Sequence, residues 1–224
     1  MRIAAMRNAL VVTLAIMPAG CGSTTPAQSD AQASSAPAAT SPPDTRTASS
    51  AWSPIENERV KVYAVDPATN PAPPVNTPIV QIYLDGNVGY LAPGGVVSLL
   101  MPGRAVGGYF VWIELKDKAI APLENRTGYP LAFPRPNVKK VLENDRVIVW
   151  DYTWTSGVPT PMHFHDKDVV VTYLEDGALR STDPKGAAVV NPHYFGFTKW
   201  NTRDRVHTEE LIQGKGRAII TELK

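Results

Sequence analysis

Between residues 51 and 224, apolar residues are concentrated in short runs rich in β-branched and aromatic side chains. Proline and glycine separate these runs at short intervals, and no stretch shows the apolar spacing of a capped amphipathic helix. This pattern predicts an all-β sandwich or barrel. Six strands are expected, at Val60–Tyr63, Ile79–Leu84, Tyr109–Leu115, Val147–Trp154, Val169–Leu174 and Arg217–Leu223.

Parts of this pattern occur twice in the same order. The matched pairs are 56–63 with 143–150, 79–85 with 169–175, and 111–116 with 219–224, at offsets of 87, 90 and 108 residues. The pattern predicts a duplicated β-module whose second copy is longer near its end. Similar composition in unrelated strands is the alternative.

The first residues have a different character. Arg2 and Arg7 precede a short apolar stretch, Ala9–Met17, and small residues then lead to Cys21, the only cysteine. This is the layout of an export signal, and the apolar stretch is shorter than the roughly 20 residues of a membrane-spanning helix. The Ala-Gly-Cys sequence resembles the lipobox of bacterial lipoproteins. We expect residues 1–20 to be removed and Cys21 to be lipidated; a free or buried cysteine is the alternative.

Residues 21–52 comprise the cysteine expected to be lipidated and a tether that follows it. Of the 29 residues 22–50, 26 are Gly, Ser, Thr, Pro, Ala or Gln. Such a composition buries too little apolar surface to fold by itself. Anchor and tether together predict a protein of the cell envelope, held by its lipid at the outer membrane or the periplasmic face if the organism is Gram-negative.

Composition excludes several classes of function. The 224 residues include 22 Lys and Arg against 21 Asp and Glu, so the net charge is +1, and no basic run occurs. A general electrostatic nucleic-acid binder is therefore excluded. A single cysteine excludes a disulfide framework and a cysteine-rich metal cluster.

Chemistry is most readily built from the histidines, of which the chain has four. His163 and His165 flank Phe164, and residues two apart on a strand point to the same face. A pair of imidazoles suits Fe, Mn, Ni, Cu or Zn, and a third ligand must come from elsewhere. His207, at the head of a strand near the C-terminus, is the natural candidate, whereas His193 is expected in a loop.

These residues resemble the motifs of the cupin superfamily. Gly157, five intervening residues and His163-Phe164-His165 match the start of its first motif, and Gly177 supplies the closing turn. His207 stands for the histidine of the second motif. The resemblance implies a double-stranded β-helix (jelly roll) with a divalent metal ion as cofactor, and it is compatible with a homodimer.

The resemblance covers residues 138–224, which we take as a C-terminal cupin domain. It reaches residues 53–137 only through the duplication, which implies a bicupin with a degenerate first repeat. No histidine precedes residue 163, so the first half cannot build a histidine site. Its expected role is to pack on the second half and complete one face of a pocket.

The chain departs from the family at the motif glutamate, which should fall at residue 169 or 170, where two valines stand. Asp168, one position earlier, is the candidate fourth ligand. Glu209 and Glu210 lie near His207 but outside the motif. The site is therefore predicted as three histidines, with Asp168 and solvent completing the set.

A polar cluster near His207 offers candidates for ligand binding. Lys199, Arg203 and Arg205 would hold a carboxylate or another small anion if they face the barrel mouth; a solvated turn is the alternative. The alternating aromatic residues of 150–154 share one face of a strand, and core packing explains them more simply than stacking on a ligand.

Two functions are compatible with these features. The first is a metal-dependent cupin that acts on a small organic molecule at the cell envelope. The second is a non-catalytic binding or scaffolding module with a vestigial metal site, as the missing glutamate and the histidine-free first half suggest.

Overall fold

The computed structural model describes residues 54–65, 75–95 and 110–224. Within these ranges the chain forms fourteen β-strands and no helix. The strands that pair into sheets do so antiparallel. None of the described residues belongs to a helix that could span a membrane. The predicted all-β class is confirmed, and each of the six predicted runs contains a strand.

The N-terminal half forms one five-stranded sheet in the order β1-β2-β5-β3-β4. Its strands are Ile55–Glu56 (β1), Val60–Val65 (β2), Ile79–Tyr83 (β3), Val88–Leu91 (β4) and Phe110–Leu115 (β5). A tight turn joins β3 directly to β4. Gly86 in this turn has a φ of 93°, which glycine adopts without steric cost.

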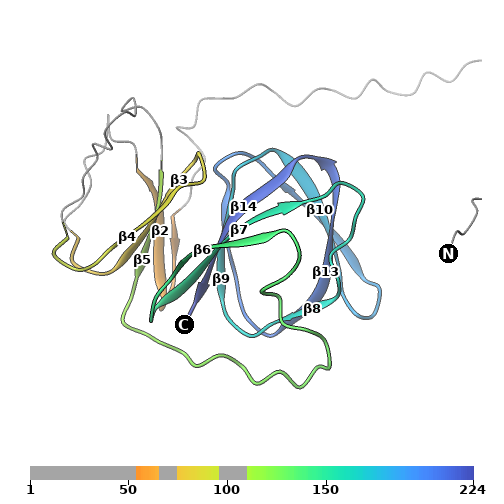
Figure 1. The fold of residues 1–224 in the computed structure, drawn as a ribbon, viewed down its shortest axis with the longest axis horizontal. Coiled ribbons are helices and arrows are strands. Elements are labelled where there is room, and N and C mark those ends of the chain that lie inside the picture. Colours follow the sequence, from red (N-terminus) through yellow and green to blue (C-terminus); the bar gives the residue numbers. More distant parts are fainter. Residues whose placement is uncertain (1–53, 66–74, 96–109) are drawn as a thin grey trace, which may run out of the picture. The chain divides into compact units, whose positions relative to one another are not determined.

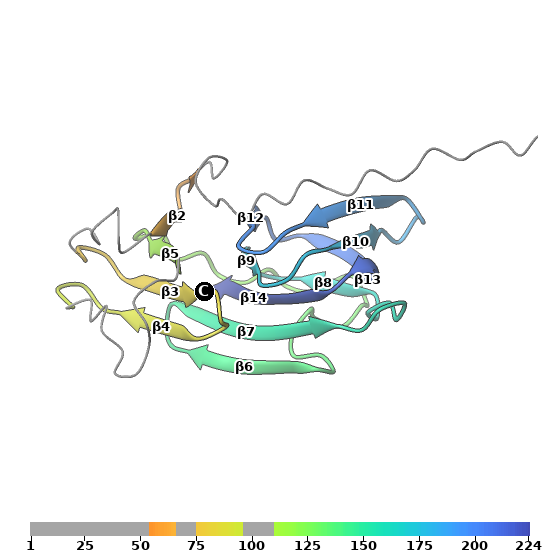
Figure 2. The ribbon, with the colours of Figure 1, turned by 90° about the horizontal axis from the view of Figure 1, so that it is seen from above.

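The C-terminal half forms two further sheets, one of five strands in the order β12-β9-β14-β7-β6 and one of four in the order β11-β10-β13-β8. Figure 2 shows β10 and β11 on one side of this unit and β6 and β7 on the other. The strands are Val138–Glu143 (β6), Val147–Trp154 (β7), His163–His165 (β8), Val169–Tyr173 (β9), Gly177–Thr182 (β10), Ala188–His193 (β11), Thr198–Asn201 (β12), Arg205–Gly214 (β13) and Gly216–Leu223 (β14).

The order in which the chain visits these two sheets defines the fold. From β7 to β14 it passes back and forth between them, so that β7 pairs with β14, β8 with β13, β9 with β12 and β10 with β11. Two four-stranded layers connected in this way form the eight-stranded jelly roll. The barrel is visible in Figure 1, and the predicted jelly-roll fold is confirmed.

The two halves share a sheet topology. The strands that carry the three sequence matches, β2, β3 and β5, hold the same places in their sheet as β7, β9 and β14 hold in theirs. Between β9 and β12 the barrel has two further strands, β10 and β11, whereas a turn alone joins the corresponding strands β3 and β4 of the first half. The described part of the first half therefore corresponds to one sheet of the barrel. The bicupin interpretation and its boundary at residue 137 remain predictions.

The barrel sheet that contains β7, β9 and β14 is buried on both faces. Val147, Val149 and Ile219 pack in one cluster with residues of β2, β3 and β5, while Trp150 and Ile220 pack in another cluster inside the barrel. Because both faces are covered, these strands have apolar side chains in both alternations. The expected packing of the first half on the second is thus observed.

A buried ion pair joins the two halves. Arg59, at the start of β2, places Nη1 2.6 Å from Oδ2 of Asp168, and the two side chains are 4% and 8% exposed. Arg59 also donates to the backbone carbonyl oxygens of Lys118 and Lys224. Both oxygens of the carboxylate have a partner, since its Oδ1 accepts from the backbone N–H of Arg203.

Replacement of Arg59 by methionine should lower the free energy of unfolding by about 3–5 kcal/mol, because the Asp168 carboxylate would stay buried without its partner. Urea unfolding measures this loss. The control is Arg126→Met, which removes an ion pair with Glu124 whose side chains are 82% and 71% exposed and should change stability by less than about 1 kcal/mol. Equal effects of the two substitutions would contradict the role assigned to Arg59.

Candidate metal centre

The site is built by the pairing of β8 with β13. Their register sets His163 opposite His207 and His165 opposite Arg205. Residues directly opposite each other in an antiparallel pair share a face, and so do residues two apart on one strand. Both rules bring His163, His165 and His207 to the same face, which is the interior of the barrel.

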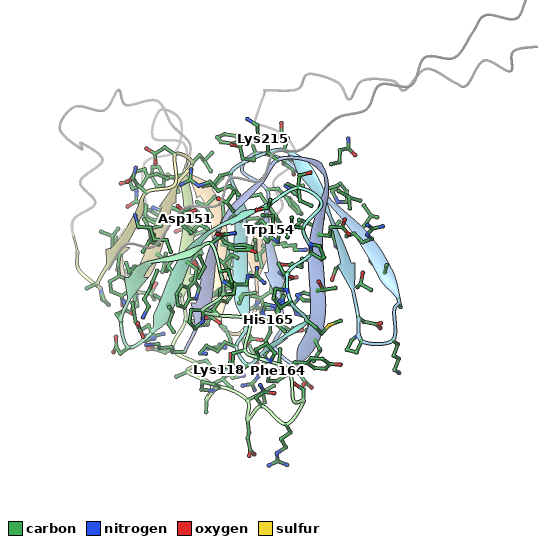
Figure 3. All side chains as sticks on the ribbon, turned by 45° about the vertical axis from the view of Figure 1, so that its right-hand side comes forward. Lys118, Asp151, Trp154, Phe164, His165 and Lys215 are labelled. Atoms are coloured by element: carbon green, nitrogen blue, oxygen red, sulfur yellow. The ribbon has the colours of Figure 1, made fainter. Side chains whose placement is uncertain are left out.

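The three imidazoles meet closely. Their ring centroids are 4.8–5.0 Å apart, and one potential ligand nitrogen from each ring lies within 4.8 Å of the others. All three residues are buried, with 2%, 6% and 9% exposure for His163, His165 and His207. In Figure 3, His165 lies within the barrel and Phe164 near its lower end. The predicted convergence of the three histidines is present.

Neighbouring groups orient two of the rings. Nδ1 of His163 lies 2.8 Å from the carbonyl oxygen of Pro161, which can only accept, so Nδ1 carries the proton and Nε2 offers a lone pair. Nδ1 of His207 lies 3.0 Å from Oγ of Ser181. Hydrogen bonds of this kind, on the nitrogen away from the site, are typical of metal-binding histidines.

The donor set fits a divalent metal ion. Nε2 of His165 lies 3.1 Å from Nε2 of His207, and Nδ1 of His165 is buried without a hydrogen bond. Metal–nitrogen bonds are about 2.0–2.1 Å, so two nitrogens at this separation can reach one ion. Burial lowers the pKa of all three histidines, so the rings are neutral and able to ligate at pH 7.

A carboxylate that the sequence did not single out as a ligand borders the three rings. Glu209 lies two residues after His207 on β13, and its Oε1 is 3.9 Å from Nε2 of His207. Burial raises its pKa, but the positive charge of Arg135 acts in the opposite direction, and the net effect holds the pKa below its usual range. Glu209 is therefore ionised and supplies negative charge beside the site.

Arg135 is a second residue beside the histidines that the sequence analysis did not identify. Its Nη1 lies 3.2 Å from Nε2 of His163, and its Nη2 lies 3.3 Å from Oε2 of Glu209. The segment before it is held on the edge of β8, where Ala132 donates to the carbonyl oxygen of Phe164 and Phe164 donates to that of Pro130. This attachment brings an arginine from outside the strand pattern into the barrel.

A cavity of about 110 Å³ lies next to the histidines inside the barrel. His165 and His207 line it together with three cationic side chains, Arg135, Lys199 and Arg205, and one carboxylate, Glu209. Burial lowers the pKa of Lys199, an effect partly offset by Glu209. The charged lining is thus predominantly positive.

Two predicted site residues lie elsewhere. Asp168 is not a fourth ligand, because its carboxylate is bound to Arg59 and to the backbone of Arg203. Arg203 does not line the cavity; its guanidinium donates to the carbonyl oxygen of Ala121. Both belong to the contacts that hold the first half to the barrel.

Two further expectations have different outcomes. His193 is not a loop residue: it ends β11, is 5% exposed, and stacks on Tyr173 at a centroid distance of 4.2 Å. The aromatic residues of 150–154 are buried in the core cluster inside the barrel, as expected, and Trp154 also lines the cavity.

The sequence pattern could have indicated one of the two residues found beside the histidines, Glu209 and Arg135, but not the other. Glu209 could have been found, since it shares the two-residue alternation of β13 with His207. Arg135 lies between two prolines in a segment without strand periodicity, on the first-half side of the predicted boundary. No local pattern indicates that it enters the barrel.

Comparisons with known proteins complete the description. No family model matches the sequence, and the search of curated proteins found no match. Among solved structures, the chain is similar to a cupin domain from Bordetella pertussis Tohama I, with 23% identity, 41% of this chain and 97% of the other covered, and a TM-score of 0.36. It is also similar to a cupin 2 conserved barrel domain protein from Leptotrichia buccalis, with 11% identity, 76% of this chain and 86% of the other covered, and a TM-score of 0.39. For the polyketide cyclase RemF from Streptomyces resistomycificus, the identity is 15%, the coverage is 46% of this chain and 80% of the other, and the TM-score is 0.34.

The barrel has the jelly-roll fold of cupins. This statement rests on the strand order of β7–β14, which matches the eight-stranded jelly roll by itself. What the neighbouring proteins bind or catalyse does not carry over at such low identity.

Acid should destabilise the metal-free protein through these histidines. Burial and the charge of Arg135 lower the pKa of His163 to about 4, against about 6.5 in the unfolded chain. Between these values the unfolded chain binds a proton that the folded protein does not, so the free energy of unfolding should fall as the pH drops from about 6.5 to about 4. For His163 alone the loss is roughly 3 kcal/mol.

Urea unfolding of the metal-free protein over this pH range measures the effect. The His163→Gln variant should show a shallower pH dependence, because it lacks one of the groups that gain a proton on unfolding. His163 would not be held neutral by the fold if the variant and the wild type gave parallel curves.

Proposed function

We propose that this protein binds a divalent metal ion through His163, His165 and His207 and uses it to act on a small organic anion at the cell envelope. The observation that carries the proposal is the convergence of three neutral, buried imidazoles beside a cavity inside a jelly roll. When bound, such an ion would polarise a ligand oxygen or activate water.

The charge of the cavity supports an anionic ligand. Lys199 and Arg205 face the cavity, and among the described residues neither has a carboxylate partner within ion-pair distance. Arg205 is oriented by a hydrogen bond from its Nε to the carbonyl oxygen of Thr202. Two half-buried cations that share only Glu209 as a nearby carboxylate among the described residues favour a carboxylate or a similar small acid as ligand, and the small volume favours a ligand of few atoms.

The chain's own residues would do most of the work on such a ligand. Lys199 and Arg205 would hold its acid group, while Trp154 and Tyr173 give the cavity an apolar wall that excludes water. Glu209, ionised at pH 7, supplies negative charge next to His207. Ligand binding without catalysis is the second candidate, favoured by the contact of Arg135 with His163.

Envelope attachment is part of this proposal and rests on the sequence. Cys21 and the tether over residues 21–52 lie outside the described residues, as does the signal over residues 1–20. A lipid on Cys21 would hold the barrel near a membrane through a segment of polar and small residues. Association into a homodimer also stays a prediction.

Metal binding is tested on the mature protein without its lipid. Purified protein incubated with Zn²⁺, Mn²⁺, Fe²⁺, Ni²⁺ or Cu²⁺ and then desalted should keep about one ion per chain by elemental analysis, because three imidazoles converge on one point. The His163→Ala/His165→Ala variant should keep none. His193→Gln, which changes a buried histidine outside the cluster, is the matched control and should bind like the wild type. Failure of the wild type to keep any of these ions would refute the proposal.

Lipidation is tested in cells of a bacterium that processes lipoproteins. The full chain should incorporate a labelled fatty acid and sediment with membranes, because the thiol of Cys21 is the acceptor. Cys21→Ser should do neither, while Ser23→Ala, two residues further on, should behave as the wild type. Fatty-acid labelling that persists in Cys21→Ser would rule out this anchor.

A further inference from the structure

Arg135 contacts two groups that border the metal site from different strands. Its guanidinium lies between Nε2 of His163, on β8, and Oε2 of Glu209, on β13. The side chain is 7% exposed, so its charge is enclosed in the barrel together with these partners. A cation thus already occupies the space next to the proposed ligands.

The bond to His163 uses the electron pair that a metal ion would need. Nδ1 of His163 is protonated and bound to Pro161, so the Nε2 lone pair is the ring's single acceptor. A lone pair that accepts an N–H from arginine cannot at the same time bind an ion. The guanidinium and a metal ion therefore exclude each other at His163.

Glu209 likewise lies within reach of both Arg135 and the histidine cluster. Its Oε1 lies 3.9 Å from Nε2 of His207, while its Oε2 is shared between Arg135 and the indole N–H of Trp154. A carboxylate at this position is a suitable fourth donor beside three imidazoles. Strand β13 therefore offers the carboxylate that is missing at residues 169–170.

The hydrogen bonds of the Arg135 guanidinium with His163 and Glu209 are long. Its contacts of 3.2 and 3.3 Å are longer than the 2.7–2.9 Å usual for charge-assisted hydrogen bonds, and its Nε is buried without a partner. The guanidinium carbon instead lies 4.1 Å from the ring centroid of Tyr152 and 4.8 Å from that of Phe133. An aromatic wall of this kind stabilises a cation without fixing its direction, so the guanidinium can turn from the histidine and stay stacked.

We propose that Arg135 is a built-in competitor of the metal ion: in the metal-free protein it occupies His163 and Glu209, and an ion that binds His163, His165 and His207 must displace it and take Glu209 as a fourth ligand. This inference rests on the metal-binding function proposed above. Arg135 is thus a residue that tunes metal affinity, and its displacement ties metal loading to a rearrangement at the cavity wall.

The test compares the Zn²⁺ affinity of variants by competition with a chromophoric chelator. Arg135→Met removes the charge and keeps much of the side-chain length, and it should bind Zn²⁺ at least tenfold more tightly than the wild type. Arg135→Gln serves as a second neutral variant if the methionine variant does not fold. Glu209→Gln should bind at least tenfold more weakly.

Arg180→Met is the matched control. Arg180 also pairs with a glutamate of β13, since its Nη2 lies 2.6 Å from Oε2 of Glu210, but this pair does not line the cavity. Its removal should change the Zn²⁺ affinity less than threefold. A similar gain in Arg180→Met and Arg135→Met would show a general effect of charge, which overturns the proposal.

Thermal stability provides a second readout of the same binding, obtained without a competing chelator. Without Arg135 the buried carboxylate of Glu209 lacks its counter-charge, so the rise in melting temperature on adding Zn²⁺ should be larger for Arg135→Met than for the wild type. Zn²⁺ binding by the wild type with no gain in the neutral variants refutes the competition and leaves the metal function intact. Absence of Zn²⁺ binding in every variant refutes both.

Discussion

The antiparallel pairing of β8 with β13 is the interaction on which the site depends. In this register, alternate residues of two neighbouring strands face the barrel interior, among them His163, His165, His207 and Glu209. A shift of the register by one residue would turn the side chains of the shifted strand to the opposite face and separate its histidines from those of the partner strand. The pairing therefore determines the ligand set directly, before any ion is considered.

The N-terminal sheet supports this arrangement from outside the barrel. Its apolar face covers β7, β9 and β14, which lets these strands be apolar on both sides and confines polar side chains to the interior near β8 and β13. The Arg59–Asp168 pair fixes the loop between β8 and β9, and the backbone of the same loop accepts the N–H of Leu123 at Asp166. The first half thus contributes no imidazole to the site but packs on the barrel sheet of β7, β9 and β14 and holds the loop that follows β8.

The sequence predicts the parts of this molecule that follow from short-range periodicity. Strand alternation was sufficient for the class, for six strands and for the shared face of His163 and His165, because each depends on spacing along one strand. The addition of His207 depended on the resemblance to the cupin motifs, since it lies 42 residues from His165 and on another strand. Asp168 was assigned wrongly because its partner, Arg59, lies 109 residues away in another sheet and no local pattern reports that contact. Arg135 was missed for the same reason, since an irregular, proline-containing segment carries it into the barrel.

The central claim is that three imidazoles of one chain bind a single ion. X-ray absorption spectroscopy at the zinc edge of the Zn²⁺-loaded mature protein tests it most directly, because imidazole rings give recognisable outer-shell scattering. We predict three imidazole nitrogens at about 2.0–2.1 Å with oxygen completing the shell. A zinc environment of oxygen alone, or with a single imidazole, would contradict the account.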